Sequence, residues 1–223
     1  MEIMEILKAV ALVVVTYLFG SIPWGFLIGK LHGIDIRDEG SGNIGATNVT
    51  RCVGKFSGKL CFALDFLKGM LPVLAAQYLV KQGYITATGH EEVYIVIATL
   101  FAAVLGHIFP VFLHFRGGKG VSTAAGAIIA LNWIALLIAL AVWVVVFLAS
   151  RYVSLASIAA AAVLPIVGWT MYLLEPEYCP ELSRSPGVLI FLTVISLLAI
   201  LRHHSNIQRL LRGTENRFGK KNE

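Results

Sequence analysis

Residues 41–51 read SGNIGATNVTR, a run of small, hydroxyl and amide residues that ends in an arginine. Its polar side chains are those of Ser41, Asn43, Thr47 and Asn48. Gly42 and Gly45 allow backbone conformations that other residues avoid, so the run can fold back on itself. Arg51 carries a permanent charge and can bind a phosphate through two parallel hydrogen bonds. We therefore predict an anion site here, although a simple loop would use many of the same turn residues.

A second polar segment, HIFPVFLHFRGGKGVST, covers residues 107–123. The glycines around its lysine, Lys119, are Gly117, Gly118 and Gly120. A helix that starts after such a loop directs unpaired N–H groups and the positive end of its dipole toward an anion. The segment is not a nucleotide-binding P-loop, because Leu113 and Gly120 stand where that motif needs Gly and Ser or Thr. It predicts a phosphate site, and the alternative is a tight cytoplasmic turn.

A third polar segment, RHHSNIQRLLRGTENR, covers residues 202–217 and follows the last apolar block. Its apolar positions fit an amphipathic helix that also carries His203, Asn206 and Arg209. Such a basic helix can lie on anionic lipid headgroups, or it can take part in substrate binding. Both interpretations are open from the residues alone.

The elements that position these segments are apolar. The chain has 223 residues, of which 57% are hydrophobic and 14% charged, against roughly a quarter charged in soluble proteins. Its hydrophobic residues come in blocks of about 20, the length that crosses a bilayer. We therefore predict an all-α integral membrane protein. Five blocks are clear, at 3–28, 60–80, 93–113, 153–174 and 187–201.

A longer apolar block, 121–150, decides the topology. Lys and Arg collect on the cytoplasmic side of membrane proteins, and here they concentrate in segments 30–59 and 202–221. All basic segments share one side only if 121–150 crosses twice, with a turn at Asn132-Trp133. The prediction is about seven transmembrane helices, N-terminus outside and C-terminus cytoplasmic. A single crossing would give six helices and put the basic tail outside.

Charge and spacing narrow the remaining chemistry. The net charge of +5 fits cytoplasmic loops facing anionic lipid or substrate, and we expect no nucleic acid partner. Three cysteines, Cys52, Cys61 and Cys179, show no disulfide or zinc spacing. Asp65 and Lys68 are three residues apart inside an apolar block, which predicts a buried structural ion pair. His107 is expected to be a hydrogen-bonded packing residue.

Taken together, the three polar segments resemble the motifs of the bacterial acyl-phosphate:glycerol-3-phosphate acyltransferases, the PlsY family. The resemblance covers nearly the whole chain, including the pairs Leu64-Asp65 and Lys68-Gly69. It implies a single membrane-embedded acyltransferase domain over residues 1–223, multi-pass in the bacterial cytoplasmic (inner) membrane, with its active site facing the cytoplasm. It also implies acyl transfer from acyl phosphate to the 1-hydroxyl of glycerol 3-phosphate. The products would be lysophosphatidic acid and phosphate, at the first step of phospholipid synthesis.

The resemblance also suggests roles for individual residues. The expected catalytic residues are Ser41, Arg51, Lys119 and His203. The expected substrate-binding residues are Asn43, Gly45, Thr47, Asn48, Gly117, Gly118, Asn206 and Arg209. His204 is adjacent to the functional histidine, and His203 is preferred because it stands three residues before Asn206. The general base is either His203 or a substrate phosphate. The expected partners are acyl phosphate, glycerol 3-phosphate, membrane lipid and the enzyme that makes acyl phosphate.

Other catalytic plans lack their residues. The chain has no HxxxxD acyltransferase signature, no GxSxG elbow for an acyl-serine and no HExxH zinc pattern. We therefore expect direct transfer without a metal, a cofactor or a covalent enzyme intermediate. A transporter of a small phosphorylated anion would use similar residues, but it should place polar or broken helices near mid-membrane. A scaffold with a lipid-binding tail would explain only the third segment.

Overall fold

The computed structural model describes residues 1–174 and 184–219, and all regular elements in those ranges are helices. Cys179, Lys220 and Lys221, which entered the sequence predictions, lie outside the described residues. The chain forms two compact units, Met1–Leu131 and Asn132–Glu223, and each is described by itself. The first contains α1 (Ile3–Gly20), α2 (Trp24–Leu31), α3 (Ala46–Cys52), α4 (Lys55–Lys81), α5 (His90–Ile108), the short 3-10 helix η1 (Val111–Leu113) and α6 (Val121–Ile129). The second contains α7 (Trp133–Ser150), α8 (Val153–Leu174), α9 (Pro186–Leu201) and α10 (His204–Leu211).

The apolar helices agree with the predicted membrane blocks. Among the described residues, five stretches are long and apolar enough to cross a bilayer: Ile3–Leu31, Lys55–Lys81, His90–Leu113, Trp133–Ser150 and Val153–Leu174. A sixth is reached if α9 and α10, which meet at a 53° bend, form one span. The helical class is therefore confirmed. The count of seven and the orientation of the termini stay predictions.

The long block 121–150 is broken in two, as predicted. Helix α6 has only nine residues, a rise of roughly 14 Å, so by itself it covers part of a bilayer. Asn132 begins the next helix, because its side-chain oxygen accepts a hydrogen bond from the Ala135 N–H at 2.9 Å. An asparagine in this position satisfies one of the N–H groups that a helix start leaves unpaired. The predicted break is therefore confirmed: it lies at residues 130–132, and Trp133 is the first residue of α7.

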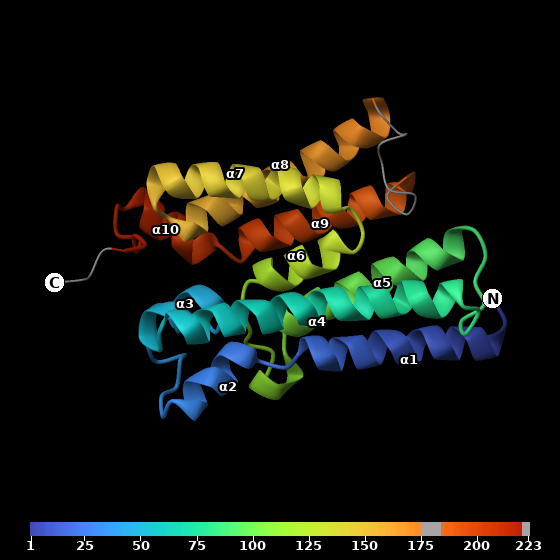
Figure 1. Cartoon of the computed structure of the whole chain (residues 1–223), viewed down its shortest axis with the longest axis horizontal. Helices are drawn as coiled ribbons and strands as arrows, with labels where there is room; N and C mark the ends of the chain where they lie inside the picture. The colour runs from blue at the N-terminus through green and yellow to red at the C-terminus, as the bar shows by residue number, and fades with distance from the viewer. Residues whose placement is uncertain (175–183, 220–223) are drawn as a thin grey trace. The chain divides into compact units, whose positions relative to one another are not determined.

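Small residues bring the helices of the first unit close together. Helices α1, α4 and α5 run side by side, and α6 packs against α4 (Figure 1). A side chain at Gly106 would overlap the backbone of α1, and one at Gly69 or Gly126 would overlap the α4–α6 contact. Close backbone approach at glycine is the usual way membrane helices gain packing contacts. The second segment therefore emerges from a tightly fixed α5 and enters a tightly fixed α6.

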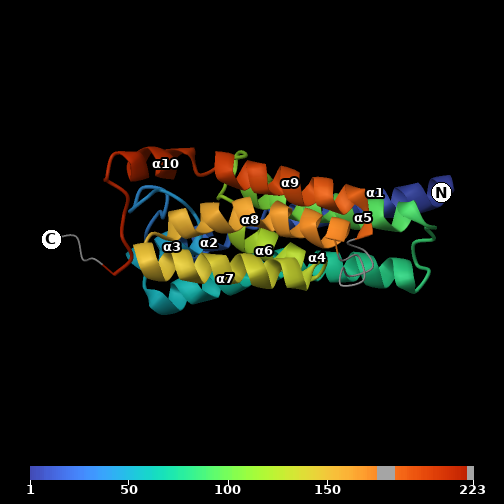
Figure 2. The ribbon, with the colours of Figure 1, turned by 90° about the horizontal axis from the view of Figure 1, so that it is seen from above.

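The second unit is a bundle of α7, α8 and α9 that carries α10 at one end (Figure 2). Its tail returns to the corner between α7 and α8. The Phe218 N–H donates to the Arg151 carbonyl at 2.9 Å, and the Phe218 ring meets Phe147 edge-on with centroids 5.6 Å apart. The Arg217 guanidinium lies 5.3 Å from the centre of the Tyr152 ring. These contacts fix the segment that follows α10.

Candidate active site

Asn48 holds the first polar segment in shape. Its side-chain oxygen accepts from the Ser41 N–H at 2.9 Å, and its amide nitrogen donates to the carbonyls of Ile36 and Glu39 at 3.1 and 3.0 Å. Both amide hydrogens are thus used inside the loop, and the side chain is buried. Asn48 therefore shapes the loop, and its predicted contact with substrate stays a prediction.

The other predicted residues of this segment divide into scaffold and surface. The Asn43 side chain accepts from the Gly45 N–H at 2.8 Å, which shapes the turn into α3. Thr47 is half-buried in the first turn of α3. Ser41 and Arg51 are exposed. These two remain available to meet a ligand from solvent.

Arg51 lies in the last turn of α3. In the described part of the chain, its guanidinium makes one hydrogen bond, from Nη1 to the Asn48 side-chain oxygen at 3.3 Å. That bond is long for a charged donor. Most of the hydrogen-bonding capacity of Arg51 is therefore left for a substrate anion.

The second segment folds back on the end of α5. The Gly117 N–H donates to the Ile108 carbonyl at 3.1 Å, and the Gly118 N–H donates to the His107 carbonyl at 3.2 Å. A side chain at either glycine would overlap the end of α5. These two amides therefore shape the loop, and their predicted substrate contacts stay predictions. Lys119 follows half-buried, and α6 begins at the next residue but one.

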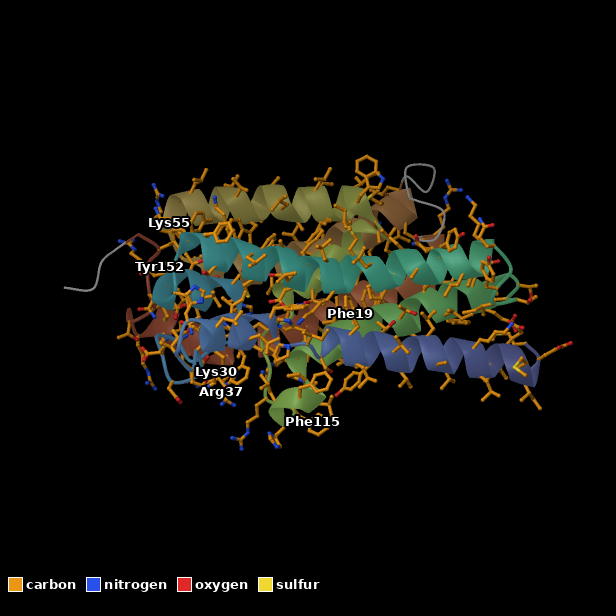
Figure 3. The ribbon with its side chains drawn as sticks, turned by 60° about the horizontal axis from the view of Figure 1, so that its bottom comes forward. Phe19, Lys30, Arg37, Lys55, Phe115 and Tyr152 are labelled. Carbon is orange, nitrogen blue, oxygen red and sulfur yellow. The ribbon has the colours of Figure 1, made fainter. Side chains whose placement is uncertain are left out.

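A single hydrophobic cluster anchors the first two segments in unit 1. Ile44 and Val49 come from the first segment and Leu113 from the second, and all three are buried. They pack with Ile28, Ile36 and Cys61. Beside this cluster, Lys30 and Arg37 both pair with Asp35, at 3.2 and 2.7 Å, and lie toward the same end of the unit as Lys55 (Figure 3).

The third segment places one histidine inside unit 2 and one on its surface. His203 is buried, whereas His204 is exposed. His203 Nδ1 lies 2.7 Å from the Ala199 carbonyl oxygen. Because a carbonyl can only accept, Nδ1 carries the proton, and in the neutral ring Nε2 is the atom that can accept one. This geometry favours His203 over His204 as the residue of fixed orientation.

Glu215, which had no predicted role, connects two side chains of the third segment to each other and to Ser154 of α8. Its carboxylate accepts from Ser154 Oγ at 2.8 Å, from Asn206 Nδ2 at 2.7 Å and from Arg209 Nε at 2.7 Å. Its negative charge could have indicated this role, since Glu215 is the only acidic residue among the arginines of 202–217. Arg209 donates to this carboxylate through Nε.

The chain that carries these three segments is similar to a known protein family. A family model described as glycerol-3-phosphate acyltransferase matches residues 10–213, which include the first two segments and most of the third. The chain belongs to this family. A glycerol-3-phosphate acyltransferase of Trichlorobacter lovleyi is 48% identical over 91% of this chain and 93% of its own length. Another, from Aquifex aeolicus, is 45% identical over 95% of this chain and 100% of its own length.

Two solved structures of this glycerol-3-phosphate acyltransferase family are also similar. One is a crystal structure of PlsY, an integral membrane glycerol 3-phosphate acyltransferase, in its glycerol 3-phosphate form. It is 44% identical, covers 95% of this chain and 96% of that chain, and has a TM-score of 0.80. The other is the lysophosphatidic acid form, with the same identity and coverage and a TM-score of 0.77. The chain therefore has the PlsY fold.

The Glu215 contacts predict a pH dependence in this acyltransferase. Burial acts to raise the pKa of Glu215, but hydrogen bonds from Asn206, Ser154 and Arg209 outweigh it and hold the pKa below the ordinary value. A lowered carboxyl pKa contributes stability that is complete above the ordinary value of 4.5 and is lost as pH falls through the folded pKa. Wild type should therefore exceed Glu215→Gln in melting temperature most at pH 7, and the gap should shrink toward pH 3.

The Glu215 comparison is made by thermal unfolding in detergent at a series of pH values. Taking the difference between the two proteins cancels the other titrating groups. Equal gaps at pH 7 and below pH 4 would contradict the assignment of a charged, bonded carboxylate.

Proposed function

We propose that this glycerol-3-phosphate acyltransferase takes its acyl group from acyl phosphate and transfers it to the 1-hydroxyl of glycerol 3-phosphate. The products are lysophosphatidic acid and phosphate, at the first step of phospholipid synthesis. The observation that carries the proposal is the pair of PlsY crystal forms, named for glycerol 3-phosphate and for lysophosphatidic acid. The second molecule is the acylated form of the first, so the pair corresponds to acceptor and product.

We propose seven membrane crossings, with the N-terminus outside and the active site on the cytoplasmic face of the bacterial inner membrane. The distribution of Lys and Arg supports this orientation. The break at Asn132 supports two passages through the 121–150 block. In this topology α6 would be the short crossing, supported by its close packing on α4.

Three cations are suited to the two phosphate-bearing substrates. Arg51 is exposed with one long bond to the protein, and Arg209 holds Glu215 through Nε alone. Lys119 belongs to a loop whose glycines are fixed against α5. We propose that each of these residues, and Asn206, binds a phosphate of a substrate and so positions a reacting group. Favourable positioning of this kind is worth about 7–11 kcal/mol of the barrier.

The chemistry requires one bond to form and one to break. The acceptor hydroxyl oxygen bonds to the acyl carbon, and the bond from that carbon to the phosphate oxygen then breaks, which releases phosphate. Hydrogen-bond donors at Ser41 would stabilise the oxyanion that forms in between. The hydroxyl proton passes either to a substrate phosphate or to His203 Nε2. Since phosphate is a good leaving group, the reaction needs no covalent enzyme intermediate.

We propose that His203 mainly orients the substrate. His203→Ala is then expected to raise the KM for glycerol 3-phosphate more than it lowers kcat, because a fixed hydrogen-bonding group is lost while a phosphate can still take the proton. The measurement is steady-state kinetics, with His204→Ala as the matched control from the same turn. An unchanged KM with kcat reduced 100-fold or more, as expected for a lost general base, would refute the orienting role.

The acyl donor is tested by competition between donors. Purified protein is supplied with labelled glycerol 3-phosphate and, in turn, with palmitoyl phosphate, palmitoyl-CoA and palmitoyl acyl carrier protein. We expect lysophosphatidic acid only with palmitoyl phosphate. Product formed equally from palmitoyl-CoA would contradict the proposed donor. Labelled acyl chain retained on the denatured protein would contradict direct transfer.

A further inference from the structure

Four polar side chains form a continuous chain inside unit 1. Lys68 Nζ lies 2.8 Å from Asp65 Oδ1, His107 Nδ1 lies 3.4 Å from the same oxygen, and Thr123 Oγ1 lies 3.2 Å from His107 Nδ1. All four are buried, with at most 4% of each residue exposed. They come from α4, α5 and α6, and the proposed reaction gives none of them a role.

The buried charges lock backbone segments together. Taking an ammonium and a carboxylate out of water is costly unless both are paired and hydrogen-bonded. Lys68 Nζ meets this need a second time by donating to the Ile22 carbonyl at 2.8 Å, in the break between α1 and α2. The chain of side chains therefore connects that break to α4, α5 and α6.

At the other end of this series of side chains, His107 and Thr123 flank the loop of residues 117–120, which contains Lys119. The His107 carbonyl accepts the Gly118 N–H, and a side chain at Gly118 would overlap His107 Nε2. Thr123 stands in the first turn of α6, just after the loop. Lys119 therefore lies between Gly118, which packs against His107, and the first turn of α6, where Thr123 is hydrogen-bonded to His107.

The Asp65 carboxylate fixes which edge of the His107 ring faces the 117–120 loop. Asp65 Oδ1 and Thr123 Oγ1 both lie beside His107 Nδ1, at 3.4 and 3.2 Å, and so hold that edge of the ring. The opposite edge of the ring, with Nε2, then faces Gly118. The orientation of the ring is thus set by a buried charge on a different helix, and the loop conformation depends on the orientation of the ring.

We propose that Asp65, His107 and Thr123 are positioning residues that hold the 117–120 loop, and so Lys119, in the conformation that binds the phosphate of glycerol 3-phosphate. The kinetic part of this proposal rests on the proposed acyltransferase function. The conformational part does not, because loop order can be measured without turnover. In this arrangement the Lys68–Asp65 ion pair fixes the position of the carboxylate. The carboxylate in turn holds His107 in place against the 117–120 loop.

The test uses hydroxyl removal at Thr123, which leaves the ion pair intact. Thr123→Val removes the bond to His107, and Thr123→Ser restores it. Thr99→Val is the matched control. Like Thr123, Thr99 is fully buried, but it lies on α5 and its hydroxyl donates to the Ile95 carbonyl of the same helix. His107→Leu removes the link altogether. The readouts are amide hydrogen exchange in purified protein and steady-state kinetics.

Thr123→Val and His107→Leu are expected to exchange the amides of 117–120 roughly tenfold faster, the loss of about one hydrogen bond, with α4 unchanged. The kcat/KM for glycerol 3-phosphate should fall about 100-fold, chiefly through KM, as expected for a misplaced binding group. Thr123→Ser and Thr99→Val should match wild type. If His107→Leu fails to fold, the Thr123 pair decides.

Wild-type exchange at 117–120 together with wild-type KM in Thr123→Val would overturn the proposal. So would faster exchange spread evenly over α4, α5 and the loop, because that is general loosening. A wild-type protein that makes no lysophosphatidic acid would instead refute the proposed function, and the exchange data would still decide the positioning role.

Discussion

Replacing Arg51 by alanine is expected to lower kcat/KM for glycerol 3-phosphate by about 10²–10³-fold while the protein stays folded. The loss follows from removing a fixed, always-charged partner for substrate phosphate. The fold should survive because Arg51 is exposed and makes one 3.3 Å bond, to a residue that keeps its other partners. Steady-state kinetics and thermal unfolding in detergent measure the two effects.

Two further variants sharpen the Arg51 prediction. Arg51→Lys keeps the charge but loses the paired geometry, so its activity should lie between wild type and alanine. Lys55→Ala is the matched control, because Lys55 is an exposed basic residue four positions later with no proposed role. An Arg51→Ala enzyme with the kcat/KM of Lys55→Ala would show that the first segment binds no substrate phosphate.

Replacing Asp65 by leucine is expected to destabilise the protein by about 3–5 kcal/mol, the cost of leaving one buried charge uncompensated. Lys68, 1% exposed, would then keep its ammonium without the carboxylate at 2.8 Å. The double variant Asp65→Leu, Lys68→Met removes both charges and should recover most of the stability. Unfolding in detergent, with the single and double variants compared as a cycle, measures the coupling.

The pair Glu5 and Lys8 provides the matched control for burial. It has the same three-residue spacing and the same 2.8 Å distance, but its Lys8 and Glu5 side chains are 44% and 13% exposed, against 1% and 3% for Lys68 and Asp65. Exposed pairs contribute little because water and salt screen them, so Glu5→Leu should cost far less than Asp65→Leu. Equal losses in the two variants would mean that spacing, and not burial, determines the contribution of such pairs.

Much of the fold follows from the sequence. Apolar blocks of about 20 residues predict the long helices because bilayer thickness fixes their length. The i, i+3 spacing of Asp65 and Lys68 predicts their pairing because it is set by helix geometry. Asn132 predicts the break between α6 and α7 because an asparagine suits a helix start. Each of these features depends on residues that are near one another in the chain.

The features that sequence reasoning missed depend on residues far apart in the chain. Asp65 and His107 are 42 positions apart, and Glu215 and Ser154 are 61 apart, so no local spacing predicts either contact. The type of Asn48 offers donors and acceptors but does not tell which groups will use them. In the structure the loop backbone uses both donors, and the predicted contact of Asn48 with substrate stays a prediction. The short length of α6 likewise depends on tertiary packing.

The central claim is that this chain acylates glycerol 3-phosphate at the membrane surface. The most direct measurement reconstitutes purified protein in vesicles with palmitoyl phosphate and labelled glycerol 3-phosphate, then follows label in lipid and in the vesicle lumen. The account predicts labelled lysophosphatidic acid and released phosphate in equal amounts, both formed about 10²–10³-fold more slowly with Arg51→Ala. Label that crosses into the lumen as unmodified glycerol 3-phosphate, with no lipid product, would contradict the enzyme and indicate an anion transporter.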